Sequence, residues 1–173
     1  MMDYFNQESE RLIFRKLTKE DIPSWVEFFV DNDRLRFLGI RDWSKSKEVL
    51  AENWVLAQLD RYEKQGLGHL AVEVKESGEF IGMGGVLPRE LNGKKEYEVS
   101  YSLKPRFWKK GYGTEMAKQM KAFGLKNIDT DRLISIIEIE NEDSIHVAKK
   151  NGMSALFNTE FLGMKVVVYG IEK

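Results

Sequence analysis

The sequence of 173 residues contains no cysteine and only two histidines. The lack of cysteine excludes disulfide bonds, thiol nucleophiles and cysteine metal sites, and it fits a reducing cytoplasm. His69 and His146 lie far apart and have no ligand spacing, so we expect no metal site. No apolar run approaches the roughly 18 residues that a membrane span needs, and residues 1–10 lack the apolar segment of a signal peptide. These absences predict a soluble, cytoplasmic protein.

An excess of charge of either sign is also missing. The formal net charge is -1, from 27 basic and 28 acidic residues. Bulk charge therefore favours neither a nucleic-acid partner nor a membrane partner. The hydrophobic content of 42% is typical of a globular protein. We expect one domain over residues 1–173, with its folded core from about residue 10.

The common phosphate-binding motifs are absent, since neither G-x-x-x-x-G-K-[ST] nor G-x-G-x-x-G occurs. A different glycine-rich stretch, residues 108–115 (WKKGYGTE), lies between a strand-like run and a helix-like run. Gly111 and Gly113 allow a tight turn and a close approach of the backbone to a ligand. The free N–H groups of the following helix, with Lys109 and Lys110 nearby, suit a pyrophosphate. The alternative is a glycine-containing loop before an ordinary helix.

The hydrophobic periodicity predicts seven strands and four helices. The strands are expected at residues 11–17, 69–74, 80–87, 96–103, 132–139, 154–161 and 164–171, with a turn at 88–95. The helices are expected from Thr18, from Ser44 or Ser46 to about 64, at 112–126 and at 141–150. This order predicts an α/β (α+β) domain with a mixed, mostly antiparallel sheet flanked by helices.

Four separated strings occur in an order that resembles one known family. They are Glu79-Phe80-Ile81-Gly82, Glu98-Val99-Ser100-Tyr101, Gly111-Tyr112-Gly113-Thr114-Glu115, and a segment that begins at Asn141 and ends at Met153. Together they are similar to the GNAT N-acetyltransferases, and the resemblance covers about residues 10–173. Trp108 stands where the family usually has Gln or Arg. That departure resembles the branch of ribosomal-protein N-terminal acetyltransferases (RimJ/RimL type).

The resemblance implies the GNAT fold and acetyl-CoA as co-substrate. The acceptor would be a primary amine, either a protein N-terminal α-amine or a small molecule, attacking the thioester directly. The residues expected to bind the cofactor are Tyr101, Ser102, Leu103, Trp108, Lys109, Lys110, Gly111, Tyr112, Gly113, Thr114, Asn141 and Ser144. The alternative is a GNAT-fold module that binds acyl-CoA without transferring it. The chain is expected to be a monomer or a homodimer.

Two residues are candidates for catalysis. Glu98 aligns with a family glutamate and is expected to act as general base through a water, although a solvated strand glutamate is the simpler interpretation. Ser144 is expected to donate an O–H to the departing thiolate, although such a serine also caps helices. Tyr101 is expected to belong to the core or to a pocket wall rather than to act as an acid, and His146 is expected to be exposed. Five charged residues are expected to border the acceptor: Asp31, Asp33, Arg34, Arg36 and Arg41.

Overall fold

The computed structural model describes residues 3–173 and contains one sheet with the strand order β1-β2-β3-β4-β5-β6-β8-β7. The strands are β1 (Asn6–Glu8), β2 (Leu12–Arg15), β3 (Gly68–Val74), β4 (Phe80–Leu91), β5 (Lys94–Leu103), β6 (Arg132–Glu138), β7 (Ser154–Phe161) and β8 (Met164–Glu172). The helices are α1 (Ile22–Trp25), α2 (Lys47–Gln65), α3 (Tyr112–Asn127) and α4 (Glu142–Lys150). Short 3₁₀ segments are η1 (Lys19–Asp21), η2 (Val26–Phe29), η3 (Leu35–Phe37) and η4 (Pro105–Phe107).

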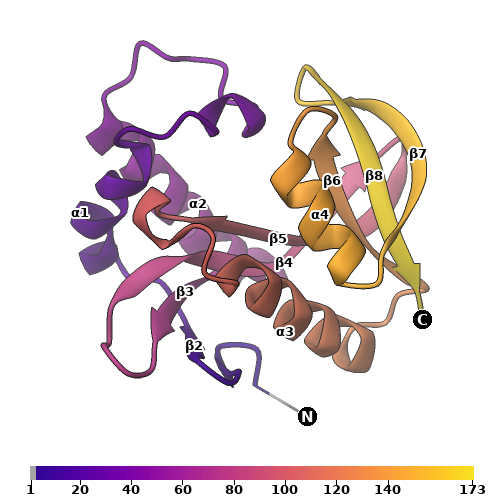
Figure 1. Cartoon of the computed structure of the whole chain (residues 1–173), viewed down its shortest axis with the longest axis horizontal. Coiled ribbons are helices and arrows are strands. Elements are labelled where there is room, and N and C mark those ends of the chain that lie inside the picture. Colours follow the sequence, from indigo (N-terminus) through magenta and orange to yellow (C-terminus); the bar gives the residue numbers. More distant parts are fainter. Residues whose placement is uncertain (1–2) are drawn as a thin grey trace.

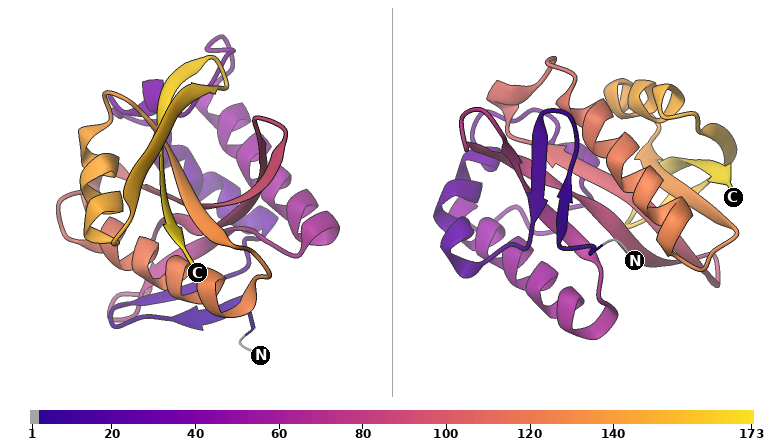
Figure 2. Two further views of the ribbon diagram at one scale, coloured as in Figure 1. Left: turned by 90° about the vertical axis from the view of Figure 1, so that its right-hand side faces the viewer. Right: turned by 90° about the horizontal axis from the view of Figure 1, so that it is seen from below.

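The helices form two layers, one on each face of the sheet. In Figure 1 and in the right panel of Figure 2, α1 and α2 lie on one side of the central strands, and α3 lies on the other. Trp25 of α1 is fully buried on the first side, and Met116 of α3 is fully buried on the second. Burial of such side chains is the main term that holds the layers together. The predicted α/β architecture is confirmed.

The strands pair antiparallel throughout the described part of the sheet, except where β5 meets β6. That parallel contact is brief, with Glu98 aligned to Ile134, and the two strands then separate. At the separation the Ser135 hydroxyl donates to the Val99 carbonyl at 2.9 Å. The Ile136 N–H donates to the Glu98 carboxylate at 3.2 Å. Side chains thus satisfy backbone groups that lack a neighbouring strand, and the sheet opens between β5 and β6.

One sequence expectation is wrong in its boundaries. Residues 88–95 were expected to form a turn, but only Asn92 and Gly93 turn, with φ values of 51° and 76°. Such a pair of positive φ angles is typical of a two-residue hairpin turn. Pro88 lies beyond the last β3–β4 pair, Gly68 with Val86, where β4 has β5 as its neighbour on one side. A residue without an N–H is accepted at such an edge. The sequence also gave no signal for β1, which is short and polar.

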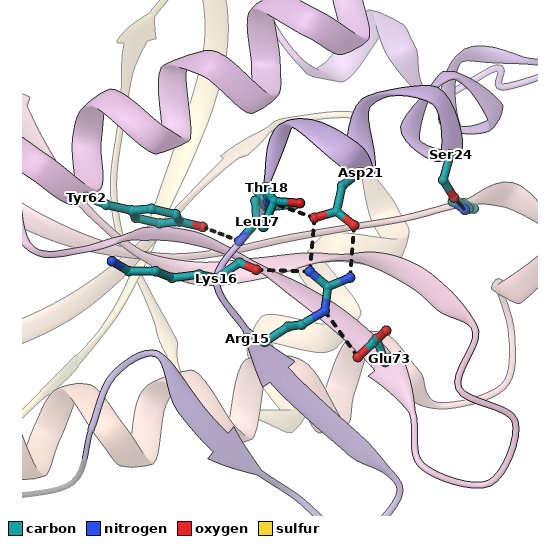
Figure 3. Close-up of polar contacts among 9 residues, drawn as sticks. Arg15, Lys16, Leu17, Thr18, Asp21, Ser24, Tyr62 and Glu73 are labelled. Atoms are coloured by element: carbon teal, nitrogen blue, oxygen red, sulfur yellow. Dashed lines mark hydrogen bonds and ion pairs between the residues drawn. The ribbon is translucent and has the colours of Figure 1, made fainter.

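The helix expected from Thr18 is divided into η1, α1 and η2, and its start is fixed by ion pairs (Figure 3). The Arg15 guanidinium donates two hydrogen bonds of 2.9 Å to Asp21, and its Nε lies 3.2 Å from Glu73. The Thr18 N–H donates to the Asp21 carboxylate at 2.8 Å, which confirms the expected capping contact. This anchoring sets the path of residues 19–38, which form one wall of the site.

Candidate active site

A cleft of about 390 Å³ lies at the opening between β5 and β6. Ten of the predicted cofactor residues line it: Tyr101, Ser102, Leu103, Trp108, Lys109, Gly111, Gly113, Thr114, Asn141 and Ser144. They come from the end of β5, the turn before α3 and the start of α4. Residues far apart in the sequence are thus brought together around one cleft.

The side chains of Lys110 and Tyr112 do not line the cleft, in contrast to the expectation. The Arg11 guanidinium carbon lies 4.4 Å from the Tyr112 ring centroid, and Arg11 donates to the Lys110 carbonyl at 3.0 Å. Glu115 accepts from the Arg11 side chain and from the Arg11 N–H, both at 2.7 Å. Burial alone would raise the pKa of Glu115, but hydrogen bonds from Ser9 and Arg11 lower it. These contacts hold the outer side of the turn, so Lys110 and Tyr112 have only their backbone to offer a cofactor.

The backbone of the turn suits an anion. Gly111 precedes α3 with a φ of 81°, a conformation that glycine adopts without strain. The Glu115 N–H bonds back to the Gly111 carbonyl at 3.1 Å. Within residues 3–173, the N–H groups of Tyr112, Gly113 and Thr114 have no hydrogen-bond acceptor. Three free donors at the positive end of a helix fit the pyrophosphate of coenzyme A.

The end of β5 offers further backbone groups to the cleft. The Lys104 N–H bonds to the Ile81 carbonyl of β4 at 2.9 Å. Because main-chain groups alternate in direction along a strand, Tyr101 and Leu103 direct theirs away from β4, toward the opening. The Leu103 carbonyl accepts the Trp108 indole N–H at 2.9 Å. Trp108 therefore ties the end of β5 to the glycine turn, and the N–H groups of Tyr101 and Leu103 face the cleft.

Two hydroxyl groups meet inside the cleft. The Asn141 carboxamide caps α4 by accepting the Ser144 N–H at 3.3 Å, so Asn141 rather than Ser144 fills the capping role. The Ser144 hydroxyl lies beside the Tyr101 phenol. Burial raises the pKa of Tyr101 to about 12, and the Ser144 hydrogen bond opposes this only in part. Tyr101 therefore carries its proton at neutral pH.

Glu98 is buried, 6% exposed, and is not the solvated glutamate of the simpler interpretation. Its carboxylate pairs with Arg89 at 2.9 Å. It lines a smaller polar cavity of about 60 Å³ that shares Tyr101 and Ser144 with the cleft. The Asn151 carboxamide oxygen also belongs to this cavity, is buried, and has no hydrogen-bond partner in the described structure. A cavity of this size with polar walls is suited to ordered water.

The opposite wall comes from the segment before α2. Of the five charged residues expected at the acceptor, Arg34 lines the cleft, whereas Asp31, Asp33, Arg36 and Arg41 do not. Phe28, Phe37 and Leu38 join Arg34 there, and Val147 and Lys150 of α4 complete the other side. Sequence reasoning missed these residues because short 3₁₀ segments carry no clear hydrophobic period. His146 is exposed at the rim, as expected.

The described residues contain no group of three or more His, Cys, Asp or Glu side chains that could hold a metal ion. Over the same residues, no helix is both long enough and apolar enough to cross a membrane. The site is thus built from backbone donors, hydroxyl groups and ion pairs.

Comparisons with known proteins identify the family of this chain. Residues 11–154 match the acetyltransferase (GNAT) domain family. An uncharacterised Bacillus subtilis protein, YkkB, is 30% identical over 127 residues, which cover 72% of this chain and 70% of YkkB. A crystal structure of an acetyltransferase from Agrobacterium tumefaciens has a TM-score of 0.80 at 22% identity, over 97% of this chain and 94% of that one. RimL, a ribosomal L7/L12 alpha-N-protein acetyltransferase in complex with coenzyme A, has a TM-score of 0.74 at 17% identity, over 95% of each chain.

The solved structures share the fold with this chain, and the family match covers most of its length. The site supports the same assignment through its free N–H groups at the start of α3 and the opening beside β5. The chain therefore belongs to the GNAT family and is an acetyl-CoA-dependent acetyltransferase.

Proposed function

We propose that this enzyme transfers the acetyl group of acetyl-CoA to a primary amine that attacks the thioester directly in a ternary complex. The acceptor is a protein N-terminal α-amine, as the name of RimL states for that protein, or the amine of a small molecule. One observation carries the proposal. The cleft joins the free N–H groups at the start of α3 to Phe28, Phe37 and Leu38 of the other helical layer. Cofactor and acceptor can thus enter from opposite sides and meet at the opening of the sheet.

The proposed cofactor contacts follow the cleft. The N–H groups of Tyr112, Gly113 and Thr114 bind the pyrophosphate, with the Lys109 ammonium beside them. The backbone N–H groups of Tyr101 and Leu103 bind the amides of the pantetheine arm. Bound in this way, acetyl-CoA supplies an activated acetyl group whose carbonyl carbon accepts the amine.

Glu98 is the proposed general base, acting through water in the polar cavity. An ammonium has no lone pair for attack, so a proton must leave the amine before the N–C bond forms. The cavity gives a path for that proton, because it connects Glu98 with Tyr101 and Ser144 of the cleft. Arg89 keeps the carboxylate in place.

Ser144 and Tyr101 are the proposed donors to the departing thiolate. As the C–S bond breaks, its electron pair goes to sulfur, and an adjacent O–H stabilises the negative charge. The Ser144 hydroxyl lies beside the Tyr101 phenol, and burial keeps the pKa of that phenol near 12. Either group retains an O–H at neutral pH, so the pair supplies a proton without an ionised acid.

The test is free-thiol release from acetyl-CoA with a panel of amines, together with calorimetric binding of CoA and ATP. The expected result is selective binding of CoA and acetyl-CoA-dependent thiol release with at least one class of amine. Peptides with free N-termini, amino acids and polyamines form the panel, and N-acetylated peptides are the control. If CoA binds selectively and no amine releases thiol, the proposed transfer to amines is wrong.

A further inference from the structure

Arg34 contacts both walls of the cleft. Its guanidinium carbon lies 3.7 Å from the centroid of the Trp108 indole, which belongs to the turn before α3. Its Nη2 lies 2.5 Å from a carboxylate oxygen of Asp143, in the first turn of α4. All three residues line the cleft. Arg34 therefore spans the cleft from the glycine turn to α4.

The chain around Arg34 is held on both sides. The Asn32 carboxamide accepts the Arg34 N–H and donates to the Phe28 carbonyl, both at 2.9 Å. Farther along, Gly39 packs on the β7–β8 turn, where an added Cβ would come within 2.9 Å of the Leu162 Cβ. Residues 31–39 thus form an arch over the site, seen between α1 and α4 at the top of Figure 1.

The stability of the fold does not explain this arrangement. The Arg34 and Asp143 side chains are 30% and 64% exposed, and ion pairs with such exposure contribute little to folding. The stacked guanidinium has five N–H donors, and Asp143 is its acceptor in the described structure. The remaining donors are available to a ligand that passes between Trp108 and α4.

We propose that Arg34 is a positioning residue that closes over the pantetheine arm of acetyl-CoA and slows its release. The inference rests on the proposed placement of the cofactor, with its pyrophosphate at α3 and its arm along the end of β5. Trp108 and Asp143 flank the path between these two places, so Arg34 crosses the arm rather than the phosphates. Its free N–H donors suit the amide carbonyl oxygens of the arm.

The test compares the affinity of variants for CoA with their affinity for its nucleotide half, adenosine 3′-phosphate 5′-diphosphate, which lacks the arm. Arg34→Met keeps an unbranched apolar stem and removes the charge and the donors of the side chain. We expect this variant to bind CoA about tenfold more weakly and to release it about tenfold faster, the size typical of one lost charged contact. Binding of the nucleotide half should change less than twofold. Arg34→Lys should not restore CoA binding, because an ammonium lacks the planar, stacked fork.

Two variants serve as matched controls, one for Arg34 and one for its partner Asp143. Arg36→Met removes a neighbouring cation that does not line the cleft, and it should leave CoA release unchanged. Asp143→Asn should speed the release of CoA, whereas Glu142→Gln, which removes a charge from the same turn of α4, should not.

Equal weakening of CoA and of its nucleotide half would overturn the inference and make Arg34 a phosphate ligand. Unchanged CoA release with a raised KM for the amine would overturn it as well and make Arg34 an acceptor residue. A wild-type protein that does not bind CoA would instead contradict the cofactor placement and the proposed function together.

Discussion

The Glu98 carboxylate accepts the Ile136 N–H at 3.2 Å and thereby joins β5 to β6 at the point where the strands separate. The same carboxylate pairs with Arg89 and lines the polar cavity behind the cleft. Glu98 thus has two roles: it joins the two strands where they separate, and it lines the cavity proposed as the proton path.

Glu98→Gln separates these two roles. Glutamine keeps an oxygen for the Ile136 N–H but is not a base, so we expect kcat to fall at least about a hundredfold while CoA binding is retained. The measurement is kcat for acetyl transfer together with the calorimetric affinity for CoA. Glu96→Gln is the matched control, because it removes a buried, Arg132-paired carboxylate of the same strand outside both cavities. An unchanged kcat in Glu98→Gln would leave Glu98 a structural role only.

Tyr101→Phe and Ser144→Ala test the proposed donors to the thiolate. Thiols ordinarily ionise near pH 8.5, so a thiolate leaves fairly well unaided, and each variant is expected to lower kcat by only about tenfold. Because the two residues are neighbours in the cleft, the double variant should lose less than the product of the single losses. Tyr97→Phe makes the same change on β5 outside the cleft and should be neutral. Full activity in the double variant would exclude Tyr101 and Ser144 as donors to the thiolate.

The raised pKa of Tyr101 predicts a pH dependence of its own. With a pKa of about 12, the phenol keeps its proton through the neutral and mildly alkaline range. Its ionisation should therefore cause no loss of kcat below about pH 11. The check is to compare wild type with Tyr101→Phe, whose alkaline limbs should coincide up to pH 10. A limb near pH 9 that is present only in the wild type would contradict this prediction.

Gly111→Ala and Gly113→Ala should both weaken CoA binding, but only Gly111→Ala should also lower the stability of the fold. Gly111 has a φ of 81°, where alanine is strained by about 1–2 kcal/mol, so this variant should unfold at lower urea and bind CoA weakly. Gly113 is helical, and an added Cβ would meet the Tyr101 ring at an ordinary 3.5 Å. Alanine there should leave stability equal or higher by up to about 1 kcal/mol and affect only CoA binding. Equal unfolding midpoints for the two variants would contradict the assignment.

His69 predicts how folding stability depends on pH. Its Nδ1 accepts the Trp54 indole N–H at 3.2 Å, and its Nε2 lies 3.0 Å from the Ser100 hydroxyl. Burial, aided by the charges of Arg61 and Arg89, lowers its pKa to about 3. Between pH 6.5 and 3 the unfolded chain therefore binds a proton that the folded chain does not, and stability falls as the pH falls.

The variant His69→Gln should be less stable than wild type at pH 7.5, because the buried contacts to Trp54 and Ser100 are altered. The difference in free energy of unfolding between the wild type and this variant should narrow toward pH 4, by up to about 1.4 kcal/mol per pH unit below 6.5. Urea unfolding at both pH values measures this difference. His146→Gln, at an exposed position, is the control and should follow the wild type. A difference in stability that stays constant with pH would contradict the lowered pKa of His69.

Several features could be predicted from sequence because their causes are local. Ser46 accepts the Val49 N–H and starts α2, and Gly66 ends it with a φ of 67°, both at the expected places. The turn at Gly111 follows from conformations that only glycine adopts freely. The order of helices and strands and the family resemblance depend on such short patterns, so both follow from the sequence alone.

The remaining features depend on residues that meet only in the folded chain. Arg11 and Glu115 are 104 positions apart, yet their contact turns Lys110 and Tyr112 away from the cleft. Glu98 looked solvated because an E-Y-E-V strand gives no sign of Arg89 or of the end of the β5–β6 pairing. The sequence by itself determined most of the helices and strands, the glycine turn and the family. Only the tertiary structure decided which side chains face the cleft, because burial and long-range pairing, not local propensity, set their direction.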